Sequence, residues 1–278
     1  MTSHFFTVDV EEYFHVSAFE GVVTRSDWTR LPSRALHAVS ILLEILARHN
    51  VTATFFILGW LARKHPEVVA AIASAGHEVA SHGWAHERVT RQNHSTFRHD
   101  VRRARRTLQD LTGAAVVGYR APSFSITRDN DWALDVLIEE GHRYDSSLVP
   151  VRRPGYGYAG GTPGVHWIRR VGGRLLELPP TTLRLGGLRL PAGGGAYFRL
   201  FPESFIHAAF RECDARGTPG TFYLHPWEVD PDQPRMPVPW WTRARHYGGL
   251  KRAAQRLERL LSAFRFGPIG LCPELRAS

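Results

Sequence analysis

Cysteine is scarce in this chain: Cys213 and Cys272 are the only two in 278 residues. They are too few and too isolated for a disulfide framework or a cysteine metal site, so we expect two reduced thiols. Long apolar runs are also missing, since residues 38–47 fall short of the roughly 18 residues that span a bilayer and are interrupted by Glu44. The first residues lack the basic and apolar segments of a signal peptide. We therefore expect a cytoplasmic protein without a transmembrane segment.

Lysine is almost absent, because Lys64 and Lys251 are the only lysines among 35 basic residues. The formal net charge is nevertheless +9, and a basic surface attracts nucleic acid, membrane headgroups or an acidic glycan. The arginines are scattered, apart from a group at 102–106 whose helical spacing is typical of a solvated helix face. No nucleic-acid recognition motif accompanies them. We expect no nucleic-acid partner, and peripheral contact with a membrane stays open.

What the chain does contain is an alternation of strand and helix patterns. Residues 5–10 and 51–57 are β-branched and aromatic, and apolar residues recur at helical spacing between them over 36–46. Such alternation predicts a parallel sheet with crossover helices, closed into a barrel or left open. Further strands are predicted at 78–81, 116–119, 143–145, 175–178 and 222–224. Helices are predicted to start at Pro66, after a cap at Ser95 and at Pro202, and to span 132–138 and 250–264. Loops are predicted at 154–164, 186–195 and 231–239.

Carboxylates and histidines follow two of the predicted strands. Asp9 and Glu11 lie where the first strand ends, which is where α/β barrels place catalysis, although acids that merely cap a loop would fit as well. His82 and His86 follow the strand at 78–81, and Gly83 between them indicates a turn into a loop. Two neutral imidazoles can bind one divalent metal with a carboxylate as third ligand and open positions for water and substrate.

Arg120 and His225 each end another predicted strand. An arginine there can pair with a carboxylate base and keep it ionised, and a histidine followed by Pro226 could protonate a leaving amine. Taken singly, a surface arginine and a structural histidine would explain both equally well. Amide hydrolysis, however, needs a nucleophile, a stabilised oxyanion and a protonated leaving nitrogen, and the set contains a group for each.

Taken in order, these segments resemble the polysaccharide deacetylase family, also called carbohydrate esterase family four or the NodB-homology family. The similarity runs from residue 7 to about residue 235 and is closest to a subgroup encoded with exosortase and exopolysaccharide loci. It implies a distorted (β/α) barrel of about seven parallel strands, in one domain over 1–278 with subgroup-specific loops and a C-terminal part from about 150. The matching segments are TVDVEEYFHV, SHGWAHE, YRAPSFS, YDSSLVP, GGAYFRL and YLHPWEVDP.

The resemblance implies a role for each matching position. Asp9 would be the general base, paired with Arg120, and His225 would be the general acid, oriented by Asp145. The backbone N–H near Ser123 would help the metal to stabilise the oxyanion. One divalent metal is implied, Zn²⁺ in the first place with Co²⁺, Ni²⁺ or Mn²⁺ as alternatives, and its ligands would be Glu11, His82 and His86.

The first motif departs from the family pattern. Most members have two adjacent aspartates, whereas here Val10 separates Asp9 from Glu11. Residues two apart in a strand point the same way, so Asp9 and Glu11 can converge while Glu12 points away. If the strand ends at Val10, Glu12 could replace Glu11, and the sequence leaves both assignments open.

The implied substrate is a polysaccharide or lipid-linked glycan that carries N-acetylated amino sugars. Aromatic faces can stack on pyranose rings, although core packing would explain the same aromatics equally well. A deformylase or amidohydrolase acting on a small non-sugar amide stays open, because a fold does not fix a substrate. A glycan-binding pseudo-enzyme is a third reading, against which the retained base, ligands and acid argue. The residues assigned to substrate binding are Ser123, Trp84, Trp227, Tyr197 and Leu224.

Overall fold

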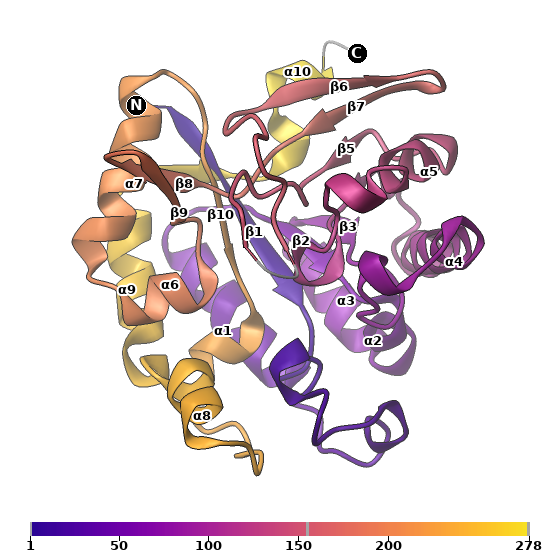
Figure 1. Cartoon of the computed structure of the whole chain (residues 1–278). Helices are drawn as coiled ribbons and strands as arrows, with labels where there is room; N and C mark the ends of the chain where they lie inside the picture. The colour runs from indigo at the N-terminus through magenta and orange to yellow at the C-terminus, as the bar shows by residue number, and fades with distance from the viewer. Residues whose placement is uncertain (1, 154–155, 277–278) are drawn as a thin grey trace.

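A computed structural model describes residues 2–153 and 156–276, and its centre is a nine-stranded sheet (Figure 1). Neighbouring strands follow the order β10-β1-β2-β3-β4-β5-β7-β6, with β11 beside β1. These pairs are parallel except for β6 and β7. The strands are β1 (Ser3–Val10), β2 (Thr54–Ile57), β3 (Glu78–Ser81), β4 (Gly118–Tyr119), β5 (Tyr144–Asp145), β6 (His166–Arg170), β7 (Gly173–Glu177), β10 (Thr221–Leu224) and β11 (Arg265–Gly267), while β8 (Thr182–Leu185) and β9 (Leu188–Pro191) form a separate hairpin.

The sheet closes into a distorted barrel through two isolated bridges. Pro180 pairs with Thr221, and Gly194 pairs with Tyr223, both in the parallel sense. Tyr223 N donates to Gly193 O at 2.7 Å, which brings the two backbones close together. Only glycine fits at 194, because a Cβ there would lie 1.7 Å from the carbonyl oxygen of Tyr223. The expected distorted barrel is confirmed, with β10, β1 to β5 and β7 as its parallel strands.

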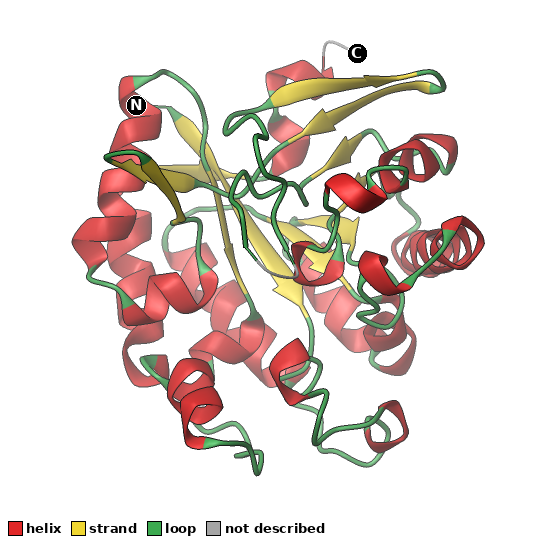
Figure 2. Ribbon diagram, viewed as in Figure 1, coloured by secondary structure: helices red, strands yellow, loops and turns green. Residues whose placement is uncertain are grey.

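Helices surround the sheet, as Figure 2 shows. Their apolar faces supply the outer layer of the core, which is why the pattern of the sequence alternates between strand and helix periods. The helices are α1 (Ala35–Arg48), α2 (Gly59–Lys64), α3 (Pro66–Ser74), α4 (His94–Thr112), α5 (Ala133–Glu139), α6 (Gly195–Leu200), α7 (Glu203–Ala215), α8 (Trp240–Tyr247), α9 (Leu250–Ala263) and α10 (Pro273–Arg276).

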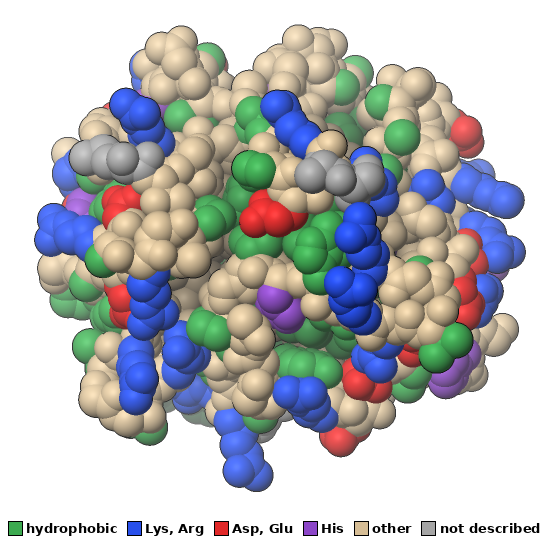
Figure 3. All heavy atoms as spheres, turned by 90° about the horizontal axis from the view of Figure 1, so that it is seen from above, with side chains coloured by type: hydrophobic (Ala, Val, Ile, Leu, Met, Phe, Trp, Pro, Cys, Tyr) green, Lys and Arg blue, Asp and Glu red, His purple; other side chains and the backbone are tan. Residues whose placement is uncertain are grey.

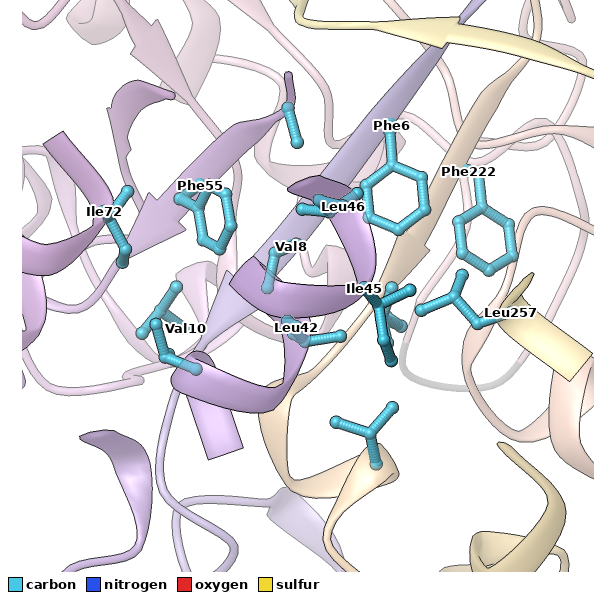
Figure 4. Close-up of a cluster of buried hydrophobic side chains, with 14 of the residues drawn as sticks. Phe6, Val8, Val10, Leu42, Ile45, Leu46, Phe55, Ile72, Phe222 and Leu257 are labelled. Atoms are coloured by element: carbon cyan, nitrogen blue, oxygen red, sulfur yellow. The ribbon is translucent and has the colours of Figure 1, made fainter. Parts of the chain in front are cut away.

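The largest hydrophobic cluster lies between the sheet and the helices on one side of it (Figure 4). Phe6 and Val8 of β1 point toward α1, where Leu42 and Leu46 lie one turn apart on the buried face. All four side chains are fully buried. Burying one such side chain stabilises the fold by about 1.5–3 kcal/mol, so this layer holds β1 firmly in place.

Alternate strand residues point into the barrel instead. At the amino ends of the strands the C-terminal segment closes the barrel, and Ile269 N donates to Thr54 Oγ1 at 2.8 Å. The strand residues that follow on the same face, such as Thr7 and Asp9 of β1, are polar and buried. The barrel interior is therefore apolar at the amino ends of the strands and polar at their carboxyl ends. The apolar interior cluster consists of Phe5, Phe56, Ala80, Tyr144, Leu176, Leu178, Ile269, Cys272 and Leu275.

The predicted helix start at Ser95 is wrong by two residues. Asn93 is the cap, because its side chain accepts from Thr96 N at 3.0 Å, and α4 begins at His94. The prediction of a loop over 186–195 is also wrong, since β9 and the first residue of α6 lie there. The loop at 231–239 is confirmed. Of the loop predicted at 154–164, residues 154 and 155 lie outside the described residues, and the rest contains neither a helix nor a ladder strand.

Basic side chains are spread over the face seen in Figure 3 rather than gathered into one patch. Within the described ranges, no helix is both long and apolar enough to cross a membrane.

Candidate active site

A cleft of about 480 Å³ opens at the carboxyl ends of β1, β3 and β10. The alternation of each strand places its last inward-facing side chain here, because Asp9, His82 and His225 continue the faces that point into the barrel. The residues predicted from the sequence that line the cleft are Asp9, Glu11, His82, His86, Ser123, Tyr197, His225 and Trp227.

Glu11, His82 and His86 form a group that could hold a metal ion. One ligand atom from each lies within 4.8 Å of the others, and all three side chains are shielded from solvent. Glu11 Oε2 lies 3.0 Å from His86 Nε2, yet it accepts no well-directed hydrogen bond from a described group. A carboxylate oxygen and an imidazole nitrogen that converge in this way are donor atoms that a cation can share. The residues therefore fit one divalent metal with open positions.

The protonation of this group suits a ligand set. Burial lowers the pKa of His82 to about 4, so its imidazole is neutral at pH 7. Burial alone would raise the pKa of Glu11, but its interactions with His86, His225 and His82 outweigh burial and hold that pKa well below its usual range. His82 Nδ1 lies 2.9 Å from Arg120 O, a contact that fixes the ring and leaves Nε2 for a metal.

The structure places Glu11, not Glu12, beside the histidines. The Glu12 carboxylate faces the start of α1, where it accepts from Arg34 N at 3.0 Å and Ala35 N at 3.3 Å and also bonds Ser33 Oγ. It thereby supplies acceptors for the free N–H groups of that helix end. The strand alternation of β1 thus continues as far as Glu11.

Asp9 is held by Arg120 at the base of the cleft. Arg120 Nη1 donates to Asp9 Oδ1 at 2.7 Å and to Thr7 Oγ1 at 2.8 Å. The other end of the guanidinium donates to Ser146 O and Oγ, and its face lies 4.2 Å from the Phe56 ring centroid. Arg120 is fully buried, so this contact set fixes the direction of the Asp9 carboxylate.

His225 is paired with Glu228, three residues further along the chain. Its Nδ1 lies 2.8 Å from Glu228 Oε1, and Arg199 donates to the other carboxylate oxygen. Burial would lower the pKa of His225, but the negative charges of Glu11 and Glu228 overcome it and raise that pKa to about 9. The imidazole is therefore charged at pH 7, as a proton donor must be.

The assignment of Asp145 as the partner of His225 is wrong. Strand alternation turns Tyr144 into the barrel and Asp145 out of it, so its carboxylate lies on the other face from His225. Asp145 instead accepts from Ser147 Oγ at 2.6 Å and lies beside Glu177 in the neighbouring strand. Burial and the Asp145 charge raise the pKa of Glu177 well above its usual range, so Glu177 keeps a proton beside the Asp145 carboxylate.

This carboxyl pair should make the stability of the fold depend on pH. Glu177 has a folded-state pKa above its unfolded value of roughly 4.3, so its contribution is complete below that value and is lost as pH rises through the folded pKa. In that window the unfolding free energy should fall by up to about 1.4 kcal/mol per pH unit. Glu177→Gln, which keeps a neutral donor beside Asp145, should flatten the slope in denaturant titrations between pH 5 and 8. Equal slopes in both proteins would contradict the assignment.

Trp227 cannot stack on a sugar, contrary to the sequence prediction. His225 and His246 both stack on its ring, at 5.0 Å and 4.3 Å between centroids, and Trp227 is only 6% exposed. Its Nε1 donates to Glu11 Oε1 at 3.2 Å. Trp227 therefore positions the candidate metal ligand and the candidate acid relative to one another.

Two other substrate-binding assignments are wrong as well. Trp84 lies outside the main cleft, where the Arg103 guanidinium covers its ring at 3.5 Å. The Leu224 side chain is fully buried in the cluster between sheet and helices. Ser123 and Tyr197 do line the cleft, and Ser123 has a φ of 56°, a strained conformation of the kind that concentrates at functional sites.

Sequence reasoning missed Glu228 and Arg199. The signal for Glu228 was present, because it follows His225 at the spacing of a capping box, and His225 N donates to its Oε1 at 3.0 Å. Arg199 comes from α6, a helix that the sequence pattern did not indicate. No local pattern could show that it would lie against Glu228.

Residues 37–141 match the model of a family described as "Polysaccharide deacetylase", and residues 146–272 match a domain of unknown function, DUF3473. A peptidoglycan-N-acetylglucosamine deacetylase from Bacillus cereus is 34% identical over 95 residues, which are 34% of each chain. A peptidoglycan deacetylase from Helicobacter pylori is 30% identical over 121 residues, covering 42% of this chain and 40% of that one. These matches span less than half of either relative.

The crystal structure of a putative polysaccharide deacetylase from Mycobacterium smegmatis shares the fold. Its TM-score is 0.68 at 23% identity, with 99% of this chain and 90% of that chain covered. The likeness extends across both matched regions and therefore includes the barrel as a whole.

Proposed function

We propose that this chain belongs to the polysaccharide deacetylase family and hydrolyses N-acetyl groups on an amino-sugar-containing polysaccharide with one bound divalent metal. The observation that carries the proposal is the convergence of three sets of residues at one cleft. Glu11 lies with the two histidines, Asp9 with Arg120, and His225 with Glu228. The subgroup resemblance makes an exopolysaccharide the proposed substrate and Zn²⁺ the proposed ion.

Glu11, His82 and His86 would hold the ion. A metal bound there would supply Lewis acidity, which lowers the pKa of water toward about 7 and polarises an amide carbonyl. Asp9, with its carboxylate oriented by Arg120, would accept the proton of the attacking water. The strained segment at Ser123 would present backbone N–H groups to the oxyanion.

His225 would protonate the departing amine. An amide nitrogen is a poor leaving group unless it gains a proton as the C–N bond breaks. The Glu228 carboxylate at Nδ1 keeps the imidazole charged and leaves Nε2 facing the cleft. Trp227, stacked on the ring, prevents it from turning away.

Removing the two histidines should remove the metal. We expect about one divalent ion per wild-type chain and almost none in His82→Ala/His86→Ala, because one carboxylate alone binds such ions weakly. Elemental analysis after gel filtration measures the difference. His65→Ala, which alters a histidine paired with Glu67 away from the cleft, should keep the wild-type metal content. Unchanged metal in the double variant would remove the proposed site.

The reaction itself is tested by acetate release. The metal-loaded protein should release acetate from oligomers of N-acetylglucosamine, and the His82→Ala/His86→Ala variant should not. Faster turnover of small N-formyl or non-sugar amides would favour an amidohydrolase instead. Metal binding without turnover of any amide would identify a pseudo-enzyme.

A further inference from the structure

The edge of the cleft formed by α8 carries side chains that the proposed chemistry does not use. Trp241 and Arg245 of this helix line the cleft together with Tyr156 and Tyr197. Trp241 is 60% exposed, and Arg245 is exposed as well. α8 packs against α6, which carries Tyr197, and lies below the end of β10 in Figure 1.

Two arginines lie near Tyr156 at this edge. Tyr156 and Tyr197 both line the cleft, and burial together with Tyr197 raises the pKa of Tyr156 to about 12. Arg153 pairs with Tyr156 in an isolated antiparallel bridge, and the positive charges of Arg153 and Arg245 both act to lower the pKa of the same hydroxyl. Residues from before β6 and from α8 therefore come together beside one tyrosine.

These two arginines have no counter-charge of their own. Within the part of the chain that the structure describes, neither Arg153 nor Arg245 forms an ion pair, whereas Arg199 in the same cleft is paired with Glu228. An exposed, unpaired guanidinium presents a fork of N–H donors that matches a carboxylate. Trp241 beside it offers a flat face of the kind that packs on the C–H groups of a sugar ring.

We propose that Arg153, Arg245 and Trp241 form a subsite for a negatively charged sugar, such as a uronic acid, that neighbours the N-acetyl sugar in the substrate chain. The inference rests on the proposed function, since it takes the cleft to hold a glycan. It makes the preferred substrate an acidic polysaccharide. The net charge of +9 favours the approach of such a chain.

An anionic membrane surface is the other partner that tryptophan and arginine would suit. The observations favour the glycan, because Trp241 and Arg245 line the same cleft as the candidate catalytic residues. A group that binds headgroups would be expected on a convex surface, whereas these two side chains face a concave one.

The test compares two ligands on the full-length protein by titration calorimetry. One is a tetramer of N-acetylglucosamine, and the other is a tetramer that alternates N-acetylglucosamine with glucuronic acid. The wild type should bind the acidic tetramer at least tenfold more tightly, with an advantage that shrinks as salt rises. Arg153→Gln/Arg245→Gln should lose that tenfold preference while its affinity for the neutral tetramer changes less than twofold. Trp241→Ala should weaken the binding of both tetramers.

A matched control removes two positive charges elsewhere. Arg106→Gln/Arg211→Gln alters exposed arginines of α4 and α7 and should retain the preference. Equal losses in both double variants would show an effect of net charge alone and overturn the subsite. So would equal affinity of the wild type for the two tetramers. Binding is measured without turnover, so a protein that binds the acidic tetramer but releases no acetate would contradict the proposed function and leave the subsite standing.

A separate measurement tests the binding of wild type and variant to vesicles of anionic phospholipid. If Arg153→Gln/Arg245→Gln loses vesicle binding while its affinities for both tetramers stay at the wild-type level, the edge binds a membrane and the glycan subsite is wrong. Vesicle binding that is absent, or unchanged in this variant, supports the subsite.

Discussion

Asp9→Asn should lower the turnover of N-acetyl substrates by about 10²–10⁴-fold while leaving the metal content unchanged. The amide of asparagine can still accept the hydrogen bond from Arg120 Nη1, which spans 2.7 Å in the wild type, but it cannot accept the proton of water. Acetate release and elemental analysis on the same sample separate the two properties. The expected result is a folded, metal-loaded and nearly inactive protein.

Asp129→Asn provides the matched control, because Asp129 is exposed and lies away from the cleft. It should show wild-type turnover and metal content. If Asp9→Asn loses its metal together with its activity, Asp9 is a metal ligand rather than the base. If it keeps full activity, the base is another residue.

His225→Ala should lower turnover by a similar factor on ordinary N-acetyl sugars, since it removes the proton donor for the amine. An anilide-type substrate, whose leaving group needs little protonation, should recover much of the lost rate. Metal content should stay at one ion per chain, because His225 Nε2 lies 3.7 Å from Glu11 Oε1, longer than a hydrogen bond. Equal losses on both substrates would assign His225 to binding or structure.

Glu228→Gln should reveal the same role in the pH profile. His225 must be protonated to act, so the rate falls at alkaline pH as the group titrates, and the Glu228 charge helps to raise its pKa to about 9. Removing that charge lowers the pKa of His225 and moves the alkaline limb to lower pH. Asp145→Asn should leave the limb in place, because Asp145 faces away from the cleft. A limb that moves in Asp145→Asn and not in Glu228→Gln would reverse this assignment.

The fold was predictable wherever a segment carried its own periodicity. β3 and the start of α3 fall where the sequence pattern put them, because apolar spacing and the Pro66 start signal are local properties. The antiparallel β6 and the hairpin of β8 and β9 were not predicted. Each of these strands carries arginine, and each owes its strand conformation to a pairing partner that a single sequence window does not contain.

Some residues of the candidate site could likewise be predicted from the sequence, and others could not. Strand-end positions such as His82 and His225 could be picked from the sequence, since motif order and strand ends mark them. The role of Trp227 could not be predicted, because two imidazoles that stack on its ring decide that role, and one of them, His246, comes from α8. That Glu228 rather than Asp145 is the partner of His225 could not be predicted for a similar reason. Which of two nearby acids meets a histidine depends on the side of the sheet that each faces.

The two bridges that close the barrel also bear on how separate molecules behave. Beyond β10 the sheet meets Pro180 and Gly194 instead of a full strand, and a proline offers no N–H to an incoming chain. At the other end, the outermost strand β6 carries Arg169 and Arg170. Charged side chains and prolines at sheet edges discourage the intermolecular β-pairing that leads to aggregation. Concentrated solutions of this protein should therefore resist strand-mediated association, even though so much of its fold is sheet.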